Sequence, residues 1–270
     1  MGPAKGRMKT RIHCESVQET PEKVFLSSWR PPPTTFELQN DEVHVWRAAL
    51  DPPAGQVWGL WTLLSADERR TAERFHFQTH RSRYIIGRGL LRTILSRYLN
   101  RAPGRLRFCY GPYGKPALVE AYGEEVLCFN VSHSRDLALF AVTRSRALGV
   151  DIEHVASDLA GQQLAERFFS PREVAALRTL PVHLRQEAFF TCWTRKEAYL
   201  KARGEGLMLA LEQFDVSLVP GEPAALLNTQ EGSQEASRWS LQDLFPGPGY
   251  VAALAVEGHE WRLTCWQWPK

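Results

Sequence analysis

The sequence predicts an α+β protein built from two similar halves, related by a pseudo-twofold axis, each with a small antiparallel sheet packed against one long helix. The segment Ala72-Glu-Arg-Phe75 recurs as Ala165-Glu-Arg-Phe168. Each copy precedes a run with apolar residues at helical spacing, over about 82–99 in the first half and about 187–202 in the second. A repeated segment in matching surroundings indicates duplication.

Strand patterns flank both copies in the same way. Segments rich in β-branched residues or with alternating polarity occur at 43–50 and 137–143 in the first half, and at 148–155 and 250–256 in the second. Because clefts between halves commonly bind ligands, we expect the active site at the seam. The predicted division of the chain is a poorly ordered N-terminal lead-in at 1–40, an N-terminal half at 41–147 and a C-terminal half at 148–270.

Turn and cap signals locate several elements more closely. Ser170-Pro-Arg-Glu173 offers an N-cap, a first-turn proline and a capping-box glutamate, so a helix should begin there, and Ser65-Ala-Asp-Glu68 has the same capping-box form. Residues 129–143 indicate two strands around a turn at Ser134-Arg-Asp136. The later elements that we expect are a strand at 216–219, a loose polar surface connection at 221–237 and a final strand at 261–268.

Two carboxylates share one face of a predicted strand. Successive side chains of a strand point to opposite faces, so Asp151 and Glu153 lie on one face while Val150 and Ile152 lie on the other. The two carboxylates therefore converge at one spot. Taken alone, such a pair is more often a solvated strand face.

A third carboxylate lies on a predicted helix. Glu197 is four residues after Trp193 and three before Leu200, on the apolar stripe, and Lys201 is one turn further along the same face. Burying a lone carboxylate costs roughly several kcal/mol, which a bound cation would offset. Hard oxygen ligands in this number suit Mg²⁺, which usually shares its coordination with substrate phosphates. The alternative is an ordinary helical ion pair between Glu197 and Lys201.

Six segments, in order along the chain, extend this pattern. They are Tyr113-Gly-Lys-Pro116, Phe129-Asn-Val-Ser-His-Ser134, Gly149-Val-Asp-Ile-Glu153, Arg167-Phe-Phe-Ser-Pro-Arg-Glu173, Trp193-Thr-Arg-Lys-Glu-Ala-Tyr-Leu-Lys201 and Gly204-Glu-Gly-Leu207. Through these segments the chain resembles the 4′-phosphopantetheinyl transferases of the two-domain, surfactin-synthetase-priming type. The resemblance extends from about Val43 to about Val256.

The resemblance implies a reaction in which the phosphopantetheine arm of coenzyme A is moved onto a serine of an apo acyl or peptidyl carrier protein, with release of 3′,5′-ADP. It also implies Mg²⁺ as the cofactor, bridging the pyrophosphate. Carried over to this sequence, the metal ligands are Asp151, Glu153 and Glu197, and the contacts to coenzyme A are Lys115, Pro116, Ser132, His133 and Lys201.

Three of these residues are expected to act in catalysis. Lys201, together with the metal, would neutralise charge that develops on the departing pyrophosphate. The carrier serine must lose a proton, and two candidates for the base remain open: Glu197, or a metal-bound water oriented by Glu153.

Plainer structural roles exist for the expected nucleotide contacts. His133 could be a polar residue beside the predicted turn, and Lys115 could be a turn lysine, because Gly114 and Pro116 are turn residues in their own right. Gly204 and the glycine two residues later are also typical of the end of a helix.

One departure from the family pattern concerns the first turn of the helix that begins near Ser65. Relatives often have lysines there that contact the 3′-phosphate, whereas this sequence has Glu68 and Thr71. Arginines are abundant in the neighbourhood, and arginine favours bidentate phosphate contacts, although most of these arginines are typical of a solvated helix face. Arg83, near the start of the long helix, is the one that we expect to contact coenzyme A.

Composition limits the class of protein. The 270 residues suffice for a proper core, and the net charge of +3 is far below the basic excess of a dedicated nucleic-acid binder. Five cysteines without C-x-x-C spacing indicate reduced thiols and no zinc site. Apolar runs of membrane-spanning length and a secretory leader are both lacking. We therefore expect a cytoplasmic monomer that binds neither nucleic acid nor membrane.

Two other functions fit parts of the pattern. A Mg²⁺-dependent nuclease or phosphodiesterase also gathers acidic residues and a lysine, but commonly places them two apart on a strand, whereas Glu197 and Lys201 are four apart on a helix. A non-catalytic module that stacks ligands on arginines and tryptophans would leave the buried carboxylates unexplained. Most tryptophans also stand at core spacing.

Overall fold

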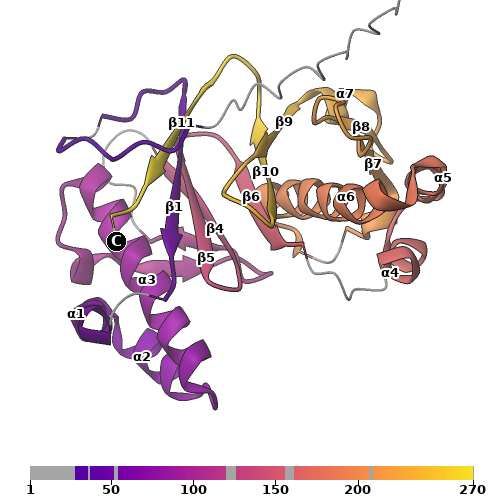
Figure 1. Cartoon of the computed structure of the whole chain (residues 1–270). Coiled ribbons are helices and arrows are strands. Elements are labelled where there is room, and N and C mark those ends of the chain that lie inside the picture. The colour runs from indigo at the N-terminus through magenta and orange to yellow at the C-terminus, as the bar shows by residue number, and fades with distance from the viewer. Residues whose placement is uncertain are drawn as a thin grey trace, which may run out of the picture.

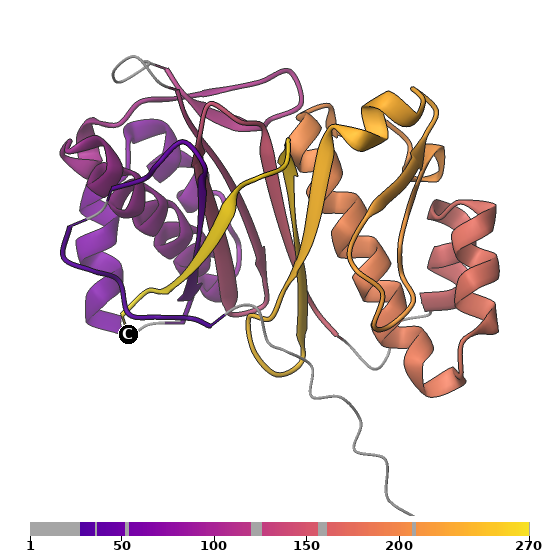
Figure 2. The ribbon, with the colours of Figure 1, turned by 90° about the horizontal axis from the view of Figure 1, so that it is seen from above.

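Two β-sheets pack face to face, and each has a long helix on its outer side, so the molecule has four layers (Figure 1; Figure 2). The computed structural model describes residues 28–35, 37–51, 54–119, 126–155, 161–206 and 209–269. The predicted α+β class with two similar halves is confirmed. Within the described ranges, no helix is both long and apolar enough to span a membrane.

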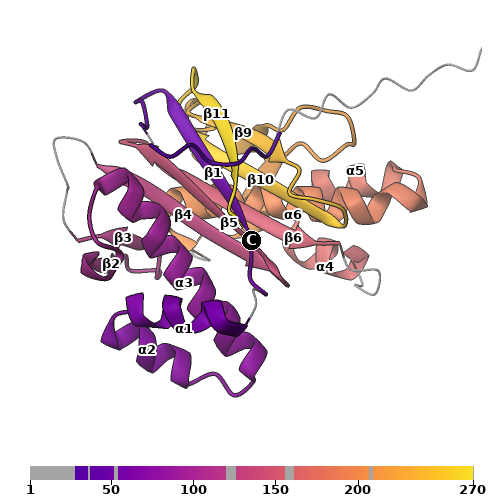
Figure 3. The ribbon, with the colours of Figure 1, turned by 60° about the vertical axis from the view of Figure 1, so that its left-hand side comes forward.

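The first sheet has the strand order β11-β1-β5-β4, and its outer face is covered by α3. The helices α1 and α2 lie against α3 (Figure 3). The core between the sheet and α3 includes Trp46, Phe140, Leu91 and Ile94, all fully buried or nearly so. The elements of this half are β1 (Glu42–Ala49), α1 (Ala54–Leu63), α2 (Ala66–Glu73), α3 (Gln78–Leu99), η1 (Pro103–Arg105), β2 (Phe108–Tyr110), β3 (Pro116–Leu118), β4 (Leu127–Ser134) and β5 (Leu137–Arg144).

The second sheet has the strand order β6-β10-β9, and its outer face is covered by α6. Between the two sheets lies a third apolar layer, formed by the inward side chains of both, such as Val45 and Leu139 from the first and Val150 and Leu254 from the second. The remaining elements are β6 (Leu148–His154), α4 (Gly161–Phe168), α5 (Pro171–Thr179), α6 (Val182–Arg203), η3 (Leu211–Gln213), β7 (Phe214–Val216), β8 (Leu226–Thr229), α7 (Ser233–Ser237), β9 (Trp239–Leu244), β10 (Tyr250–Glu257) and β11 (Arg262–Gln267).

The chain departs from the sequence expectations at its two ends. The final strand, β11, pairs in parallel with β1 of the first sheet, so the division at residue 148 does not separate two self-contained sheets. Of the expected lead-in at 1–40, residues 1–27 lie outside the described ranges. The prediction of poor order is wrong for Arg30, which forms a bridge with Trp266 of β11, and for Leu38, which is buried.

Two local predictions in the second half were also wrong. The strand expected at 216–219 lies earlier, at β7, and the connection expected to be loose at 221–237 contains β8 and α7. The two copies of Ala-Glu-Arg-Phe fall on helices that are not equivalent, at the end of α2 and at the end of α4. The extra helix α5 separates the second copy from α6, so this repeat does not align the halves.

A better alignment of the halves comes from two buried ion pairs. In the first half the capping-box residue Glu68 accepts from the backbone N–H of Ser65 (3.0 Å) and pairs with Arg92 of α3 (2.7 Å). In the second half Glu173, in the capping box of α5, pairs with Lys196 of α6 (2.8 Å). Each half thus joins a short capped helix to its long helix through one buried glutamate.

Buried His44 on β1 is held in its neutral form. Its Nδ1 lies 2.8 Å from the hydroxyl of Tyr98, and that same hydroxyl accepts from Trp46 Nε1 (2.8 Å). With Nε1 of Trp46 as a donor to this oxygen, the Tyr98 O–H is assigned as the donor to Nδ1, which makes Nδ1 an acceptor. Burial lowers the pKa of His44 to about 4.

Acid should destabilise the fold through His44. The unfolded histidine takes up a proton near pH 6.5, whereas the folded one does so only near pH 4, so the stability contributed by neutral His44 is lost as the pH falls through this interval. The full difference between the two pKa values corresponds to a change of about 3 kcal/mol in the free energy of unfolding. Urea unfolding at several pH values should show this slope in the wild type and a shallower one in His44→Gln. Equal slopes in the two proteins would contradict the assignment.

Candidate active site

Strands β4 and β6 are joined across the seam by side chains of β4. Alternate polar residues of β4 accept hydrogen bonds from alternate backbone N–H groups of β6, and no backbone ladder connects these two described strands. The pairs are Asn130 Oδ1 with Val150 N (2.9 Å), Ser132 Oγ with Ile152 N (3.4 Å) and Ser134 Oγ with His154 N (3.1 Å). Two strands from different halves are thereby held in fixed register.

The same two serines orient the strand carboxylates. Ser132 Oγ donates to Asp151 Oδ1 (2.8 Å), and Ser134 Oγ donates to Glu153 Oε2 (2.9 Å). Sequence reasoning named Ser132 as a nucleotide contact and did not select Ser134. The alternation Asn-x-Ser-x-Ser on β4, matched to Asp-x-Glu on β6, is the signal that would have indicated this pairing.

Lys201 reaches the same point from α6. Its Nζ lies 2.5 Å from Asp151 Oδ1 and 3.0 Å from Ser132 Oγ. The hydroxyl of Ser132 therefore donates to the aspartate and accepts from the ammonium group and from the Ile152 N–H, which uses its full hydrogen-bonding capacity. Asp151 as a whole residue is only 3% exposed. An exposed strand face, the plainer alternative for Asp151, is thus excluded.

The position of α6 against β6 depends on a glycine and on two buried cations. A Cβ at Gly149 would lie 2.1 Å from the backbone oxygen of Ala198, so only glycine allows this close approach. Arg195 of α6 forms a bidentate pair with Asp243 of β9 (2.9 and 2.6 Å), and Lys196 pairs with Glu173. These contacts fix the rotation of α6 about its own axis. They thereby also fix the direction in which the next residue, Glu197, points.

Asp151, Glu153 and Glu197 are all shielded from solvent to a large extent. Burial is the main cause of the raised pKa of Asp151, Glu153 and Glu197, and the charge of Asp151 raises the pKa of the other two further. One oxygen, Asp151 Oδ2, is buried and accepts no hydrogen bond. Lys201 contacts Oδ1 of Asp151 and leaves Oδ2 without a cation among the described side chains.

A ready-made metal centre is not present among these side chains. Within the part of the chain that the structure describes, no three Asp, Glu, His or Cys side chains are gathered closely enough to hold a metal ion. The expected meeting of Asp151, Glu153 and Glu197 at one point is therefore not seen, and the contacts of Asp151 Oδ1 are instead Lys201 and Ser132. The uncompensated oxygen atoms nevertheless fit a hard cation chemically.

Two adjoining cavities lead to this group. A cavity of about 250 Å³ is lined by Glu197 and Lys201 of the second half and by Tyr113 and Lys115 of the first. It shares Pro116 and Val131 with a larger cavity of about 720 Å³ between α3 and β4. The polar and basic side chains of the larger cavity are His80, Arg83, Tyr84, Arg88, His133, Ser134 and Arg135.

The structure separates some of the predicted nucleotide contacts. His133 lines the larger cavity, whereas Ser132, its neighbour on β4, faces Asp151 across the seam, so the two lie on opposite faces of the strand. Burial, together with the charges of Lys201 and Arg83, lowers the pKa of His133. Arg83 also lines the larger cavity, where Asp51 binds it through two hydrogen bonds (3.0 and 2.8 Å).

Lys115 and Glu68 have structural partners that the sequence did not indicate. Lys115 Nζ donates to the backbone oxygens of Leu148 and Ala202, both at 3.0 Å, so it ties the first half to β6 and to the end of α6. Burial lowers its pKa to about 8. Glu68 accepts from Arg88 (2.7 Å) as well as from Arg92, which explains an acidic residue beside a basic cavity.

A buried aspartate and two half-buried glutamates beside a lysine, at the end of a groove with basic walls, define a class of site at which enzymes bind phosphate-containing substrates and transfer groups from them. Residues 147–255 match the family described as the 4′-phosphopantetheinyl transferase superfamily, and residues 49–145 match the 4′-phosphopantetheinyl transferase N-terminal family. The chain belongs to this superfamily and has the two-domain form. It is a holo-carrier-protein synthase, which modifies carrier proteins with phosphopantetheine from coenzyme A.

Three curated relatives show the extent of the similarity. The 4′-phosphopantetheinyl transferase HetI of Nostoc sp. is 45% identical over 241 residues, which are 89% of this chain and 98% of HetI. A putative 4′-phosphopantetheinyl transferase of Synechocystis sp. is 34% identical over 73% of this chain and 77% of its own length. The 4′-phosphopantetheinyl transferase Sfp of Bacillus subtilis is 30% identical over 58% of this chain and 67% of its own.

Proposed function

We propose that coenzyme A lies along the two adjoining cavities. Its nucleotide would occupy the larger cavity with Arg83 and His133, and its pyrophosphate would reach Lys201 in the smaller one. The observation that carries this proposal is that both cavities share Pro116 and Val131, so one elongated ligand can enter both. The basic lining of the larger cavity suits a phosphate group.

Asp151, Glu153 and Glu197 would hold Mg²⁺. Their raised pKa values and the unpaired Oδ2 of Asp151 support this assignment, because oxygen atoms that lack positive charge around them favour a hard cation. When bound, the ion would supply charge neutralisation at the pyrophosphate.

Lys201 and Glu197 would act directly in the reaction. The ammonium group of Lys201 stabilises negative charge that develops on the departing 3′,5′-ADP. Glu197 accepts the proton of the carrier serine. A water oriented by Glu153 is the alternative base. Ser132 and Ser134 hold the two strand carboxylates in place.

The partner would be an apo acyl or peptidyl carrier protein. Because residues from both halves of one chain complete the seam, a monomer suffices for activity. The thiols of the four cysteines in the described ranges are free, in keeping with a reducing cytoplasm. Neither nucleic acid nor a membrane is needed for this chemistry.

Purified protein, given coenzyme A, Mg²⁺ and an apo carrier protein, should add the mass of phosphopantetheine to the carrier serine. Intact-protein mass spectrometry of a panel of fatty-acid, polyketide and peptide-synthetase carriers measures this addition. Carriers in which the serine is replaced by alanine are the control and should stay unmodified. If no carrier of the panel gains the mass, the proposed activity is wrong.

A further inference from the structure

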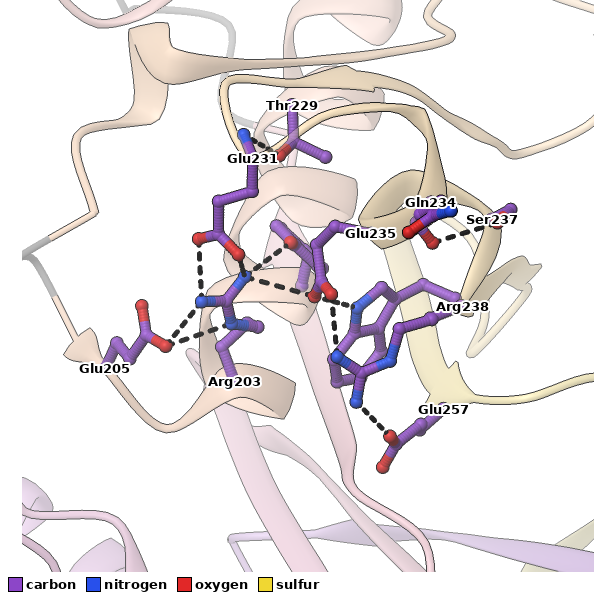
Figure 4. A network of polar contacts seen from close by, with 11 residues as sticks. Arg203, Glu205, Thr229, Glu231, Gln234, Glu235, Ser237, Arg238 and Glu257 are labelled. Atoms are coloured by element: carbon purple, nitrogen blue, oxygen red, sulfur yellow. Dashed lines mark hydrogen bonds and ion pairs between the residues drawn. The ribbon is translucent and has the colours of Figure 1, made fainter.

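Arg203, the last residue of α6, is the centre of a polar network that lies outside the transfer site (Figure 4). Its Nε and Nη2 donate to Glu205 Oε1 (3.0 and 2.6 Å), and its Nη1 donates to the hydroxyl of Tyr199 (3.0 Å). Both oxygens of Glu231 (2.9 and 3.1 Å) and Oε1 of Glu235 (3.2 Å) also accept from it. Three carboxylates thus hold one guanidinium group, whose side chain is 13% exposed.

One side of this network is anchored in the second half. Glu235 of α7 also accepts from the indole N–H of Trp239 (2.8 Å) and from Arg238 (2.7 Å), and Arg238 in turn donates to Glu257 of β10 (2.5 Å). Arg203 is thus anchored to α7 through Oε1 of Glu235, whereas Arg238 binds the other oxygen of that glutamate (Figure 4).

The other side of the network is a tight turn. Glu205 stands between Gly204 (φ +72°) and Gly206 (φ +58°), both in the left-handed region. A Cβ at Gly206 would lie 2.9 Å from Cβ of Tyr113, and one at Gly204 would lie 3.3 Å from Cδ of Lys115. At this turn the second half therefore packs closely against the β2–β3 hairpin of the first half.

The turn and the hairpin are also walls of the smaller cavity. Gly204 and Gly206 from the turn and Tyr113 from the hairpin all line it, together with Glu197 and Lys201. A shift of the turn would change the width of a cavity of only about 250 Å³. A cavity that is held at the width of its ligand binds that ligand more tightly than one whose wall must first be ordered.

We propose that Arg203 is a positioning residue for the transfer reaction. It holds Glu205, and with it the turn at Gly204 and Gly206, at the distance from Tyr113 that fits the pyrophosphate end of coenzyme A. Each partly exposed ion pair contributes little to the free energy of unfolding. The main effect of the network is therefore to fix the geometry of this turn. The planar guanidinium matches several carboxylates at once, which a lysine ammonium group does not. The inference rests on the proposed function of the smaller cavity.

The test compares Arg203→Met with a matched control, Arg238→Met. Arg238 belongs to the same network and contacts Glu235 and Glu257, but it does not touch Glu205. We expect Arg203→Met to raise the KM for coenzyme A about tenfold, with kcat changed less than about twofold, and Arg238→Met to leave both constants as in the wild type. Arg203→Lys should lie between the wild type and Arg203→Met.

Two measurements separate this inference from the proposed function. Calorimetric titration with coenzyme A alone needs no carrier protein, and it should show the same tenfold weakening in Arg203→Met. If the wild type modifies no carrier but this weakening is seen, the proposed function fails and the positioning role stands. If Arg203→Met lowers the melting temperature yet binds coenzyme A like the wild type, Arg203 is merely structural and the inference is overturned.

Discussion

Replacing Glu197 by glutamine should reduce phosphopantetheine transfer about a thousandfold while leaving the fold at least as stable as the wild type at neutral pH. The side chain keeps its shape but loses the charge that we assign to metal binding and proton transfer. Steady-state turnover and thermal unfolding measure the two effects. Loss of activity without loss of stability is the combination that distinguishes a site residue from a core residue.

The stability of this variant follows from the sign of the pKa shift. Burial raises the pKa of Glu197 above 4.5, and the charges of Asp151 and Glu153 raise it further. The contribution of Glu197 to the free energy of unfolding is fully present below pH 4.5. It is lost as the pH rises through the raised pKa of the folded state. Glu197→Gln should therefore melt higher than the wild type near neutral pH, and the difference should vanish below about pH 4.5.

Added Mg²⁺ and a control variant sharpen this test. Mg²⁺ should raise the melting temperature of the wild type more than that of Glu197→Gln, because the variant lacks one charged ligand. Glu166→Gln, which removes an exposed glutamate paired with Arg178, should behave like the wild type in every assay. Turnover of Glu197→Gln above a tenth of the wild-type value would show that this glutamate is misassigned.

Replacing Lys196 by methionine should cause a large loss of stability. Lys196 is fully buried, lies 2.8 Å from the carboxylate of Glu173, and donates to the backbone oxygens of Leu211 (2.7 Å) and Phe214. Methionine fills the space but leaves a buried carboxylate without its cation, which costs about 3–5 kcal/mol. Thermal unfolding should show a melting temperature lower by roughly 10 °C.

A second substitution tests whether the unpaired charge is the cause. Glu173→Gln added to Lys196→Met removes the buried negative charge, so the double variant should recover part of the lost stability. Glutamine keeps one oxygen that can accept from the backbone N–H of Val216, as Glu173 does at 2.8 Å. A double variant less stable than Lys196→Met alone would indicate that packing, and not charge, dominates at this position.

The sequence predicted those features that depend on neighbouring residues. The turn at Arg135 and Asp136 between β4 and β5, the capping box of Ser170, and the end of α6 at Gly204 were all confirmed. Each of these follows from residues within one turn or one hairpin. The common face of Asp151 and Glu153 was confirmed for the same reason, because it requires only the alternation of a strand.

Features that join distant segments could not be predicted in this way. Ser134 holds Glu153 because β4 and β6 lie side by side in one register, and no local pattern fixes that register. The partners of Lys115 are backbone oxygens, which have no signature in the sequence. The fourth residue of the capping box at Ser65 became half of a buried ion pair with Arg92, a contact that depends on how α2 packs on α3.

The crossing of β11 affects how the chain can fold during synthesis. Residues 262–267, which leave the ribosome after the other strands of the described ranges, lie along the edge of β1, the first of those strands to be made. Until they arrive, β1 exposes unpaired N–H and C=O groups to any other extended polypeptide. The first sheet can therefore be completed only after β11 has been translated. A fragment that stops at residue 147 lacks β11 and would be prone to aggregate.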